Sequence, residues 1–134
     1  MREKVWRWGP TLLCAVAIFA LSSMPKLPEP PGILGELTKF DKVNHTIAYI
    51  VLGALVLRSL AWSQQITRAI AARAWLITAI YGATDEIHQS FVPGRYCDIM
   101  DWVADAAGAA VGIVAMTVYY RYKGGNHYGR RKRL

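Results

Sequence analysis

Acidic residues and cysteines are scarce in this chain. Its 134 residues include nine Asp and Glu against sixteen Lys and Arg, and charged residues make up only 19% of the total. Two cysteines are too few for the disulfide framework of a small secreted domain, so we expect Cys14 and Cys97 to be free thiols. The length suits one domain. The hydrophobic share of 54% is high for a soluble protein of this size.

Several motifs of common functional sites are also missing. The chain has no His-Glu-x-x-His zinc motif, no glycine-rich phosphate-binding loop and no serine at motif spacing from a base. The net charge of +7 comes without a nucleic-acid recognition motif. We therefore interpret the basic tail of residues 121–134 as a topology signal near anionic lipid head groups, and predict no nucleic-acid partner. Whether the protein is an enzyme stays open at this stage.

Four long apolar segments are present and predict membrane-spanning helices, because about 20 mainly apolar residues cross the hydrocarbon core. The expected fold is all-α, a four-helix transmembrane bundle that forms a single domain over residues 1–134. The helices are expected at about 5–24, 43–62, 70–88 and 99–120. The third segment is the weakest, because Arg73 lies near its start. The first also resembles a signal peptide, but no clean cleavage site follows, and we expect it to be retained.

Basic residues are unevenly distributed along the chain. Three precede the first helix, three lie around the link between the second and third, and six follow the fourth. Loops rich in Lys and Arg stay in the cytoplasm. We therefore expect a multi-pass protein of the cytoplasmic (inner) membrane, with both termini in the cytoplasm and two acidic loops outside. A short interfacial helix is expected in the first outer loop, where apolar residues recur at helical spacing at Ile33, Leu34, Leu37 and Phe40.

Three short polar segments map to helix ends on that outer side. The candidate polar site consists of Asp41, His45, Asp85, Glu86, Gln89, Arg95, Asp98, Asp101 and Asp105. A charged group at membrane depth is costly unless it is paired, hydrated or enclosed by protein. Several such groups at one level therefore predict a shared polar site.

The stripe that carries Asp101 and Asp105 continues to Gly108 and Gly112. A Gly-x-x-x-Gly stripe lets a second helix approach closely, so we expect the acids to face the bundle rather than lipid. Asp105 lies roughly 10 Å below Asp98 at about 1.5 Å per residue. We expect it to stay protonated or to pair with a cationic group, for which the candidates are Arg95, Lys42, His45 and His88.

Three roles for this site are open on the residues alone. Carboxylate, imidazole and amide ligands suit a divalent metal, although no spacing fixes one, and we predict no cofactor. Arg95 offers a fork suited to phosphate, and His45 or His88 can transfer a proton near neutral pH. The third role is a structural network that fixes helix order, in which Arg95 pairs with Asp85, Asp98 or Asp101. We expect the first helix to be an anchor rather than part of the site.

The polar motifs resemble those of a known family. Four of them occur in order over about residues 40–115: Asp41-x-x-x-His45-x-x-x-Tyr49, Asp85-Glu86-x-x-Gln89-x-x-x-Pro93-Gly94-Arg95, Asp98-x-x-Asp101 and Gly108-x-x-x-Gly112. This pattern resembles the VanZ-like family of small membrane proteins. Members of that family commonly carry Asn where this chain has Asp105.

The resemblance implies a protein of the cell envelope. The family's namesake is associated with low-level resistance to the glycopeptide antibiotic teicoplanin. The function that we expect is an outward-facing polar site for a lipid-linked or peptidoglycan-related molecule, with the lipid bilayer and an anionic lipid or envelope precursor as partners. The alternative is a non-enzymatic membrane assembly or interaction protein whose buried polar network is structural.

Overall fold

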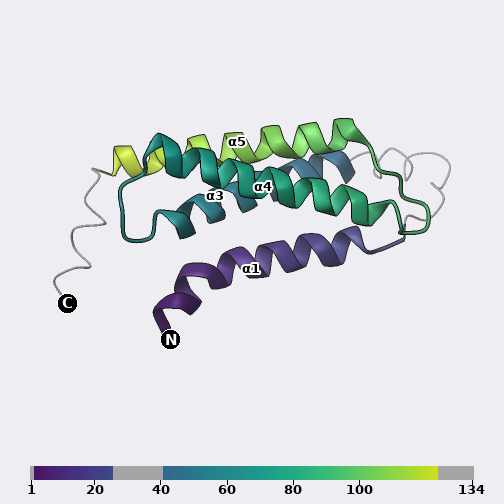
Figure 1. The fold of residues 1–134 in the computed structure, drawn as a ribbon, viewed down its shortest axis with the longest axis horizontal. Helices are drawn as coiled ribbons and strands as arrows, with labels where there is room; N and C mark the ends of the chain where they lie inside the picture. Colours follow the sequence, from purple (N-terminus) through teal and green to yellow (C-terminus); the bar gives the residue numbers. More distant parts are fainter. Residues whose placement is uncertain (1, 26–40, 124–134) are drawn as a thin grey trace.

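The bundle consists of four long helices that run alternately in opposite directions (Figure 1). The computed structural model describes residues 2–25 and 41–123, with the side chains of 41 and 42 left out. The helices are α1 (Arg2–Ser22), α3 (Asp41–Leu60), α4 (Arg68–Gln89) and α5 (Ile99–Tyr122), and no strand occurs among the described residues. The expected all-α four-helix fold is confirmed.

The alternation brings the end of α1, the start of α3, the end of α4 and the start of α5 to one end of the bundle, here named the polar end (Figure 1). The opposite end is named the basic end. Its described cationic residues are Arg2, Lys4, Arg7, Arg58, Arg68, Arg73, Arg121 and Lys123. The predicted interfacial helix before Asp41 and the tail beyond Lys123 lie outside the described residues.

Three of the four helices, α1, α3 from Val43 onward, and α5, are long and apolar enough to cross a membrane. α4 has 22 residues but carries charged residues near both of its ends, which lower its apolar content. It nevertheless packs against both α3 and α5. The outer surface of the helices exposes large apolar side chains such as Leu13, Val16 and Val114. Such a surface suits a bundle that is surrounded by lipid tails.

α1 begins three residues before its expected start, and Pro10 consequently lies inside the helix instead of near its first turn. Proline has no N–H to donate to the carbonyl one turn earlier, which here belongs to Trp6. The carbonyl of Trp6 accepts a hydrogen bond from Nη2 of Arg58 on α3 instead, at 3.1 Å. A side chain of the neighbouring helix thus replaces the bond that the proline removes.

Local signals fix the helix starts and the turn at the polar end. The side chain of Thr67 caps α4, and that of Asp98 caps α5 by accepting from the backbone N–H of Met100 at 2.8 Å. After α4 the chain reverses through a turn in which Gly94 has φ 76°, a backbone conformation that other residues rarely adopt. This turn places Arg95 beside the ends of α1 and α4.

Glycines bring α3 and α5 into close contact. A Cβ atom added at Gly108 would lie 2.8 Å from the backbone oxygen of Thr46. One added at Gly112 would overlap the backbone oxygen of Ile50. The small-residue stripe of α5 therefore faces α3, and it carries Asp105 toward the same helix.

Two tryptophans connect α4 to α5. Nε1 of Trp75 donates to the carbonyl of Ala106 at 3.0 Å, and Nε1 of Trp102 donates to the carbonyl of Ala79 at 2.9 Å. Indole rings in a bundle provide both apolar area and one donor that needs a partner. The two bonds fix the register of α4 against α5.

α1 contacts different helices at its two ends. At the basic end, the hydroxyl of Ser59 on α3 donates to the carbonyl of Arg7 at 2.7 Å and lies 2.8 Å from the hydroxyl of Thr11. At the polar end, Ser22 of α1 donates to Asp85 of α4. α1 thus changes its polar partner from α3 to α4 along its length.

Candidate functional site

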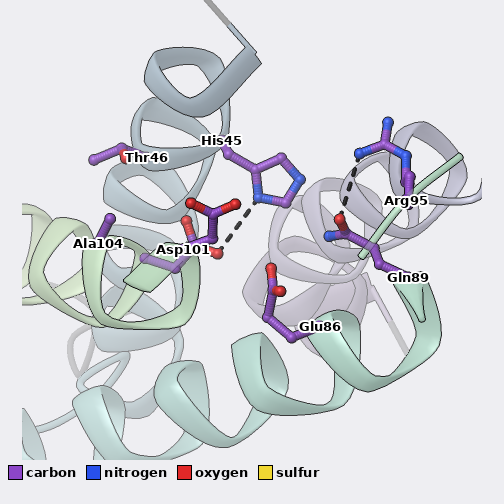
Figure 2. Close-up of a pocket in the computed structure, with 8 residues that line it drawn as sticks. His45, Thr46, Glu86, Gln89, Arg95, Asp101 and Ala104 are labelled. Atoms are coloured by element: carbon purple, nitrogen blue, oxygen red, sulfur yellow. Dashed lines mark hydrogen bonds and ion pairs between the residues drawn. The ribbon is translucent and has the colours of Figure 1, made fainter. Parts of the chain in front are cut away.

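A small pocket opens at the polar end of the bundle (Figure 2). It is lined by His45, Thr46, Glu86, Gln89, Arg95, Asp101, Ala104 and Asp105, which come from α3, α4, α5 and the turn after α4. Its volume is about 40 Å³, enough for a few water molecules or a small polar group. Of the nine predicted site residues, six line this pocket, and the other three are Asp41, Asp85 and Asp98.

His45 lies between two buried carboxyl groups of different helices. Its Nδ1 is 3.4 Å from Oδ2 of Asp105 on α5, and its Nε2 is 4.0 Å from Oδ2 of Asp85 on α4. The two acids are only 2% and 3% exposed. Buried carboxylates need a nearby cation or donors, and a protonated imidazole here would face both of them. Among the four groups expected to pair with Asp105, the structure therefore places His45 beside it.

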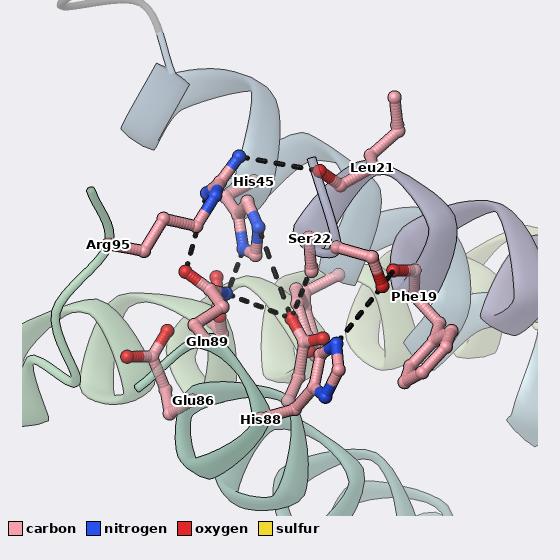
Figure 3. A network of polar contacts seen from close by, with 12 residues as sticks. Phe19, Leu21, Ser22, His45, Glu86, His88, Gln89 and Arg95 are labelled. Atoms are coloured by element: carbon pink, nitrogen blue, oxygen red, sulfur yellow. Dashed lines mark hydrogen bonds and ion pairs between the residues drawn. The ribbon is translucent and has the colours of Figure 1, made fainter. Parts of the chain in front are cut away.

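Asp85 connects three helices through a single oxygen. Its Oδ2 accepts from the hydroxyl of Ser22 at 2.8 Å, from Nε2 of Gln89 at 3.2 Å and from the hydroxyl of Tyr49 at 3.3 Å (Figure 3). Its Oδ1 is buried and has no hydrogen-bond partner within the part of the chain that the structure describes. Asp85 is therefore held by hydroxyl and amide donors from α1, α3 and α4.

Arg95 contacts the end of α1 rather than Asp85, one of the three acids expected to pair with it. Its Nε donates to the carbonyl of Met24 at 2.9 Å and its Nη2 to the carbonyl of Leu21 at 3.3 Å, while Nη1 donates to Oε1 of Gln89 at 3.4 Å (Figure 3). The last carbonyls of a helix lack partners within it and carry partial negative charge. A cationic side chain placed here by the turn therefore binds them favourably.

α1 does contribute to the polar network, and the prediction that it is only an anchor was wrong. It supplies the hydroxyl of Ser22 and the backbone acceptor of Leu21, and Met24 just after it supplies a second backbone acceptor. The helix carries no charge near its end, and a backbone carbonyl has no signature in the sequence. Nothing in the spacing of Ser22 relates it to Asp85, which lies 63 residues further along the chain.

The remaining predicted residues lie at the end of α4 and at the starts of α5 and α3. Oε2 of Glu86 accepts from the backbone N–H of Asp98 at 3.0 Å, which ties the first turn of α5 to the end of α4. Asp101 lines the pocket from that first turn. Asp41 is the first residue of α3, and its side chain lies outside the described part of the structure.

Two aromatic side chains extend the network. Tyr49 is fully buried and stacks on His45, with ring centroids 5.8 Å apart. The hydroxyl of Tyr81 donates to the carbonyl of Ala15 in the middle of α1 at 2.7 Å. Both rings therefore combine packing with a hydrogen-bonding hydroxyl. Thr46, which was not among the predicted residues, lines the pocket directly after His45.

The described carboxylates contact donors of the protein itself. Within residues 2–25 and 41–123, no group of three or more His, Cys, Asp and Glu is arranged to hold a metal ion. Asp85, Glu86 and Asp105 instead contact hydroxyls, an amide, a backbone N–H and an imidazole.

These features define an all-helical membrane protein with a polar pocket at one end of its bundle. The chain belongs to the VanZ family, since the VanZ/LLP1 family model matches residues 7–120. The resemblance seen in the polar motifs is thereby confirmed, and the match extends over all four helices. Comparison with curated proteins and with solved structures found no match.

Proposed function

We propose that this protein acts in the cell envelope and binds the anionic head of a lipid-linked or peptidoglycan-related molecule in its polar pocket. The observation that carries the proposal is the convergence of side chains from α3, α4, α5 and the turn after α4 on one pocket. Ionisable residues among membrane helices are costly and generally mark functional sites. Arg95 provides the donor geometry that suits phosphate or carboxylate.

The distribution of charge supports an outward-facing pocket in the cytoplasmic membrane. The basic end carries cationic residues on all four helices. Because Lys and Arg near membrane spans favour the cytoplasmic side, the basic end and both chain termini are assigned to the cytoplasm. The pocket at the opposite end then opens where envelope precursors and anionic lipids of the outer leaflet are available.

Family membership supports a link to glycopeptide sensitivity. The family's namesake is associated with low-level teicoplanin resistance, and glycopeptides act on the envelope outside the cell. We therefore expect that expression of this protein in a susceptible host raises the teicoplanin concentration needed to stop growth.

A structural role for the network is the competing function. Asp85 accepts hydrogen bonds from three helices at once, which favours a part in fixing helix order. Under this alternative the protein is a non-enzymatic assembly or interaction protein, and the polar end specifies its packing.

The variant Asp101→Asn separates the two functions. Asp101 lines the pocket, and Asn keeps its shape while removing its charge. If the pocket binds a ligand, the variant should lose the teicoplanin phenotype while its abundance and melting temperature stay near those of the wild type. Glu3→Gln, which removes an exposed acid at the basic end, is the matched control and should keep the phenotype.

Arg95→Gln provides the second arm of this test. It removes the guanidinium that would bind the head group. It also removes the hydrogen bonds of that guanidinium to the carbonyls of Leu21 and Met24. Unfolding of both Asp101→Asn and Arg95→Gln would favour the structural alternative. Stable variants that both retain full teicoplanin resistance would contradict the binding proposal.

A further inference from the structure

A second, larger cavity adjoins the polar pocket between α1 and α3. Ile18 and Leu21 of α1, Met24 just after it, and Ala48 of α3 form its apolar walls. Its polar lining consists of Asn44, His45 and Arg95. The volume is about 290 Å³, near the lower limit of about 300 Å³ for typical ligand sites.

The polar contacts of α1 change from α3 to α4 along its length, and the groove lies where they have changed. The hydroxyl of Thr11 still donates to the carbonyl of Leu55 on α3, at 3.2 Å. Further along, the described polar contacts of α1 with other helices are to α4, where Tyr81 bonds to Ala15.

The end of α1 continues this attachment to α4. Phe19 stacks on His88 with ring centroids 4.5 Å apart, and Ser22 bonds to Asp85 (Figure 3). The apolar groove therefore lies between α1 and α3 at the polar end, where the polar side chain of Ser22 bonds to α4 and not to α3.

The groove and the polar pocket share two residues, His45 and Arg95. The groove lies between α1 and α3, two helices that are apolar enough to span a membrane. At the polar end the groove is lined by the guanidinium of Arg95, a group that suits phosphate. One continuous surface thus offers apolar contacts for a chain and a cationic group for a head.

We infer that the ligand is a membrane lipid phosphate, which enters sideways from the bilayer with one hydrocarbon chain in the α1–α3 groove and its phosphate at Arg95. This inference rests on the proposed function and names the class of ligand for the same pocket. The pocket of about 40 Å³ beyond Arg95 accepts only a small part of the head group. The hydrocarbon chain of the ligand therefore remains in contact with the lipid bilayer while its phosphate is bound.

Three probes distinguish the whole ligand from its parts. Farnesyl phosphate has one hydrocarbon chain and a phosphate, farnesol has the chain alone, and inorganic phosphate has the head alone. Binding of each is measured to the full-length protein in lipid nanodiscs, with radiolabelled farnesyl phosphate and with the other two as competitors. We expect saturable binding of one farnesyl phosphate per protein, and at least tenfold weaker competition by farnesol and by phosphate.

Variants of α1 test the groove itself. Leu21→Trp enlarges a side chain that lines the groove, and Leu13→Trp makes the same change on the same helix at a site outside it. Both leucines are exposed, at 59% and 72%. We expect at least a tenfold loss of farnesyl phosphate binding in Leu21→Trp and none in Leu13→Trp. Ala48→Leu fills the groove from α3 and should show the same loss if Leu21→Trp does not fold.

The outcomes separate this inference from the proposed function. Farnesyl phosphate binding that survives both groove-filling variants but is lost in Asp101→Asn would overturn the groove while leaving the pocket as a binding site. Equal competition by farnesol would overturn the assignment of the phosphate to Arg95, and equal competition by inorganic phosphate would overturn the lipid. Absence of farnesyl phosphate binding overturns the inference whatever the teicoplanin measurements give.

Discussion

The hydroxyl of Ser22 donates a 2.8 Å hydrogen bond to the carboxylate of Asp85, and both residues are almost completely buried. The bond fastens the end of α1 to α4 at the point where the polar network begins. Helices in lipid gain little from the hydrophobic effect when they associate, so bonds of this kind contribute to which helices pair. The first helix is thereby connected to the pocket that the other three helices line.

Ser22→Ala should lower the free energy of unfolding by about 1–2 kcal/mol, because Oδ2 of Asp85 loses its shortest donor in a buried place. The measurement is unfolding of the purified protein in detergent micelles. Ser63→Ala changes an exposed serine after α3 and should shift the same quantity by less than about 0.5 kcal/mol. Equal effects of the two substitutions would argue against a specific role for the bond.

Gly112→Ala should destabilise the bundle by at least about 2–3 kcal/mol, because the added methyl group overlaps the backbone of Ile50 and must force α3 from α5. Gly9→Ala is the control. A Cβ there meets only a side-chain atom of Val5 at 3.9 Å, and alanine favours the helix. Melting temperatures of the two variants decide the matter, and a stable Gly112→Ala protein would show that the two helices are not in close contact.

His45 and Asp105 should be energetically coupled. His45→Gln leaves the buried Asp105 without the imidazole beside it, whereas in an Asp105→Asn background the same change removes a much weaker interaction. We expect a coupling energy of about 1–2 kcal/mol in a double-mutant cycle based on unfolding free energies. Asp105→Asn alone should be tolerated, since Asn keeps the size of the side chain and removes the buried charge that needs a cation beside it. Additive effects within about 0.3 kcal/mol would mean that the two side chains do not interact.

Trp102→Phe and Trp75→Phe should each lower the unfolding free energy by about 1 kcal/mol, since each removes an indole N–H that bonds to a carbonyl across the α4–α5 contact. Trp6→Phe provides the comparison because this ring is 65% exposed at the basic end. Chemical unfolding followed by circular dichroism would register the difference. No effect of either the Trp75 or the Trp102 substitution would show that the indole bonds do not hold α4 in place.

Labelling of the two cysteines tests on which side of the membrane the pocket opens. Cys97 is exposed in the turn before α5, whereas Cys14 is half-buried in the middle of α1. In single-cysteine variants, a membrane-impermeant maleimide added to intact cells should label Cys97 and leave Cys14 unlabelled. Labelling of Cys97 only after the membrane is permeabilised would place the pocket on the cytoplasmic side and contradict the proposed topology.

The fold was predictable from apolar segments of the right length. The partner of Asp105 was not predictable, because four cationic candidates lay at plausible positions. Close contact at Gly108 brings α5 against Thr46, and this geometry places Asp105 beside the adjacent His45. The contacts of Arg95 with the backbone carbonyls of Leu21 and Met24 could not be predicted either, since every residue has such a carbonyl.

α4 has a consequence for how the protein enters its membrane. Its neighbours are apolar enough to partition into lipid individually, while α4 carries Arg73 near one end and the Asp85–Glu86 pair near the other. Charged residues raise the cost of inserting a lone segment. We therefore expect α4 to enter the membrane together with α3 as a helical hairpin. α5 then packs against both helices. The contacts of α4 with α3 and α5 would then assist its insertion as well as position the residues that line the pocket.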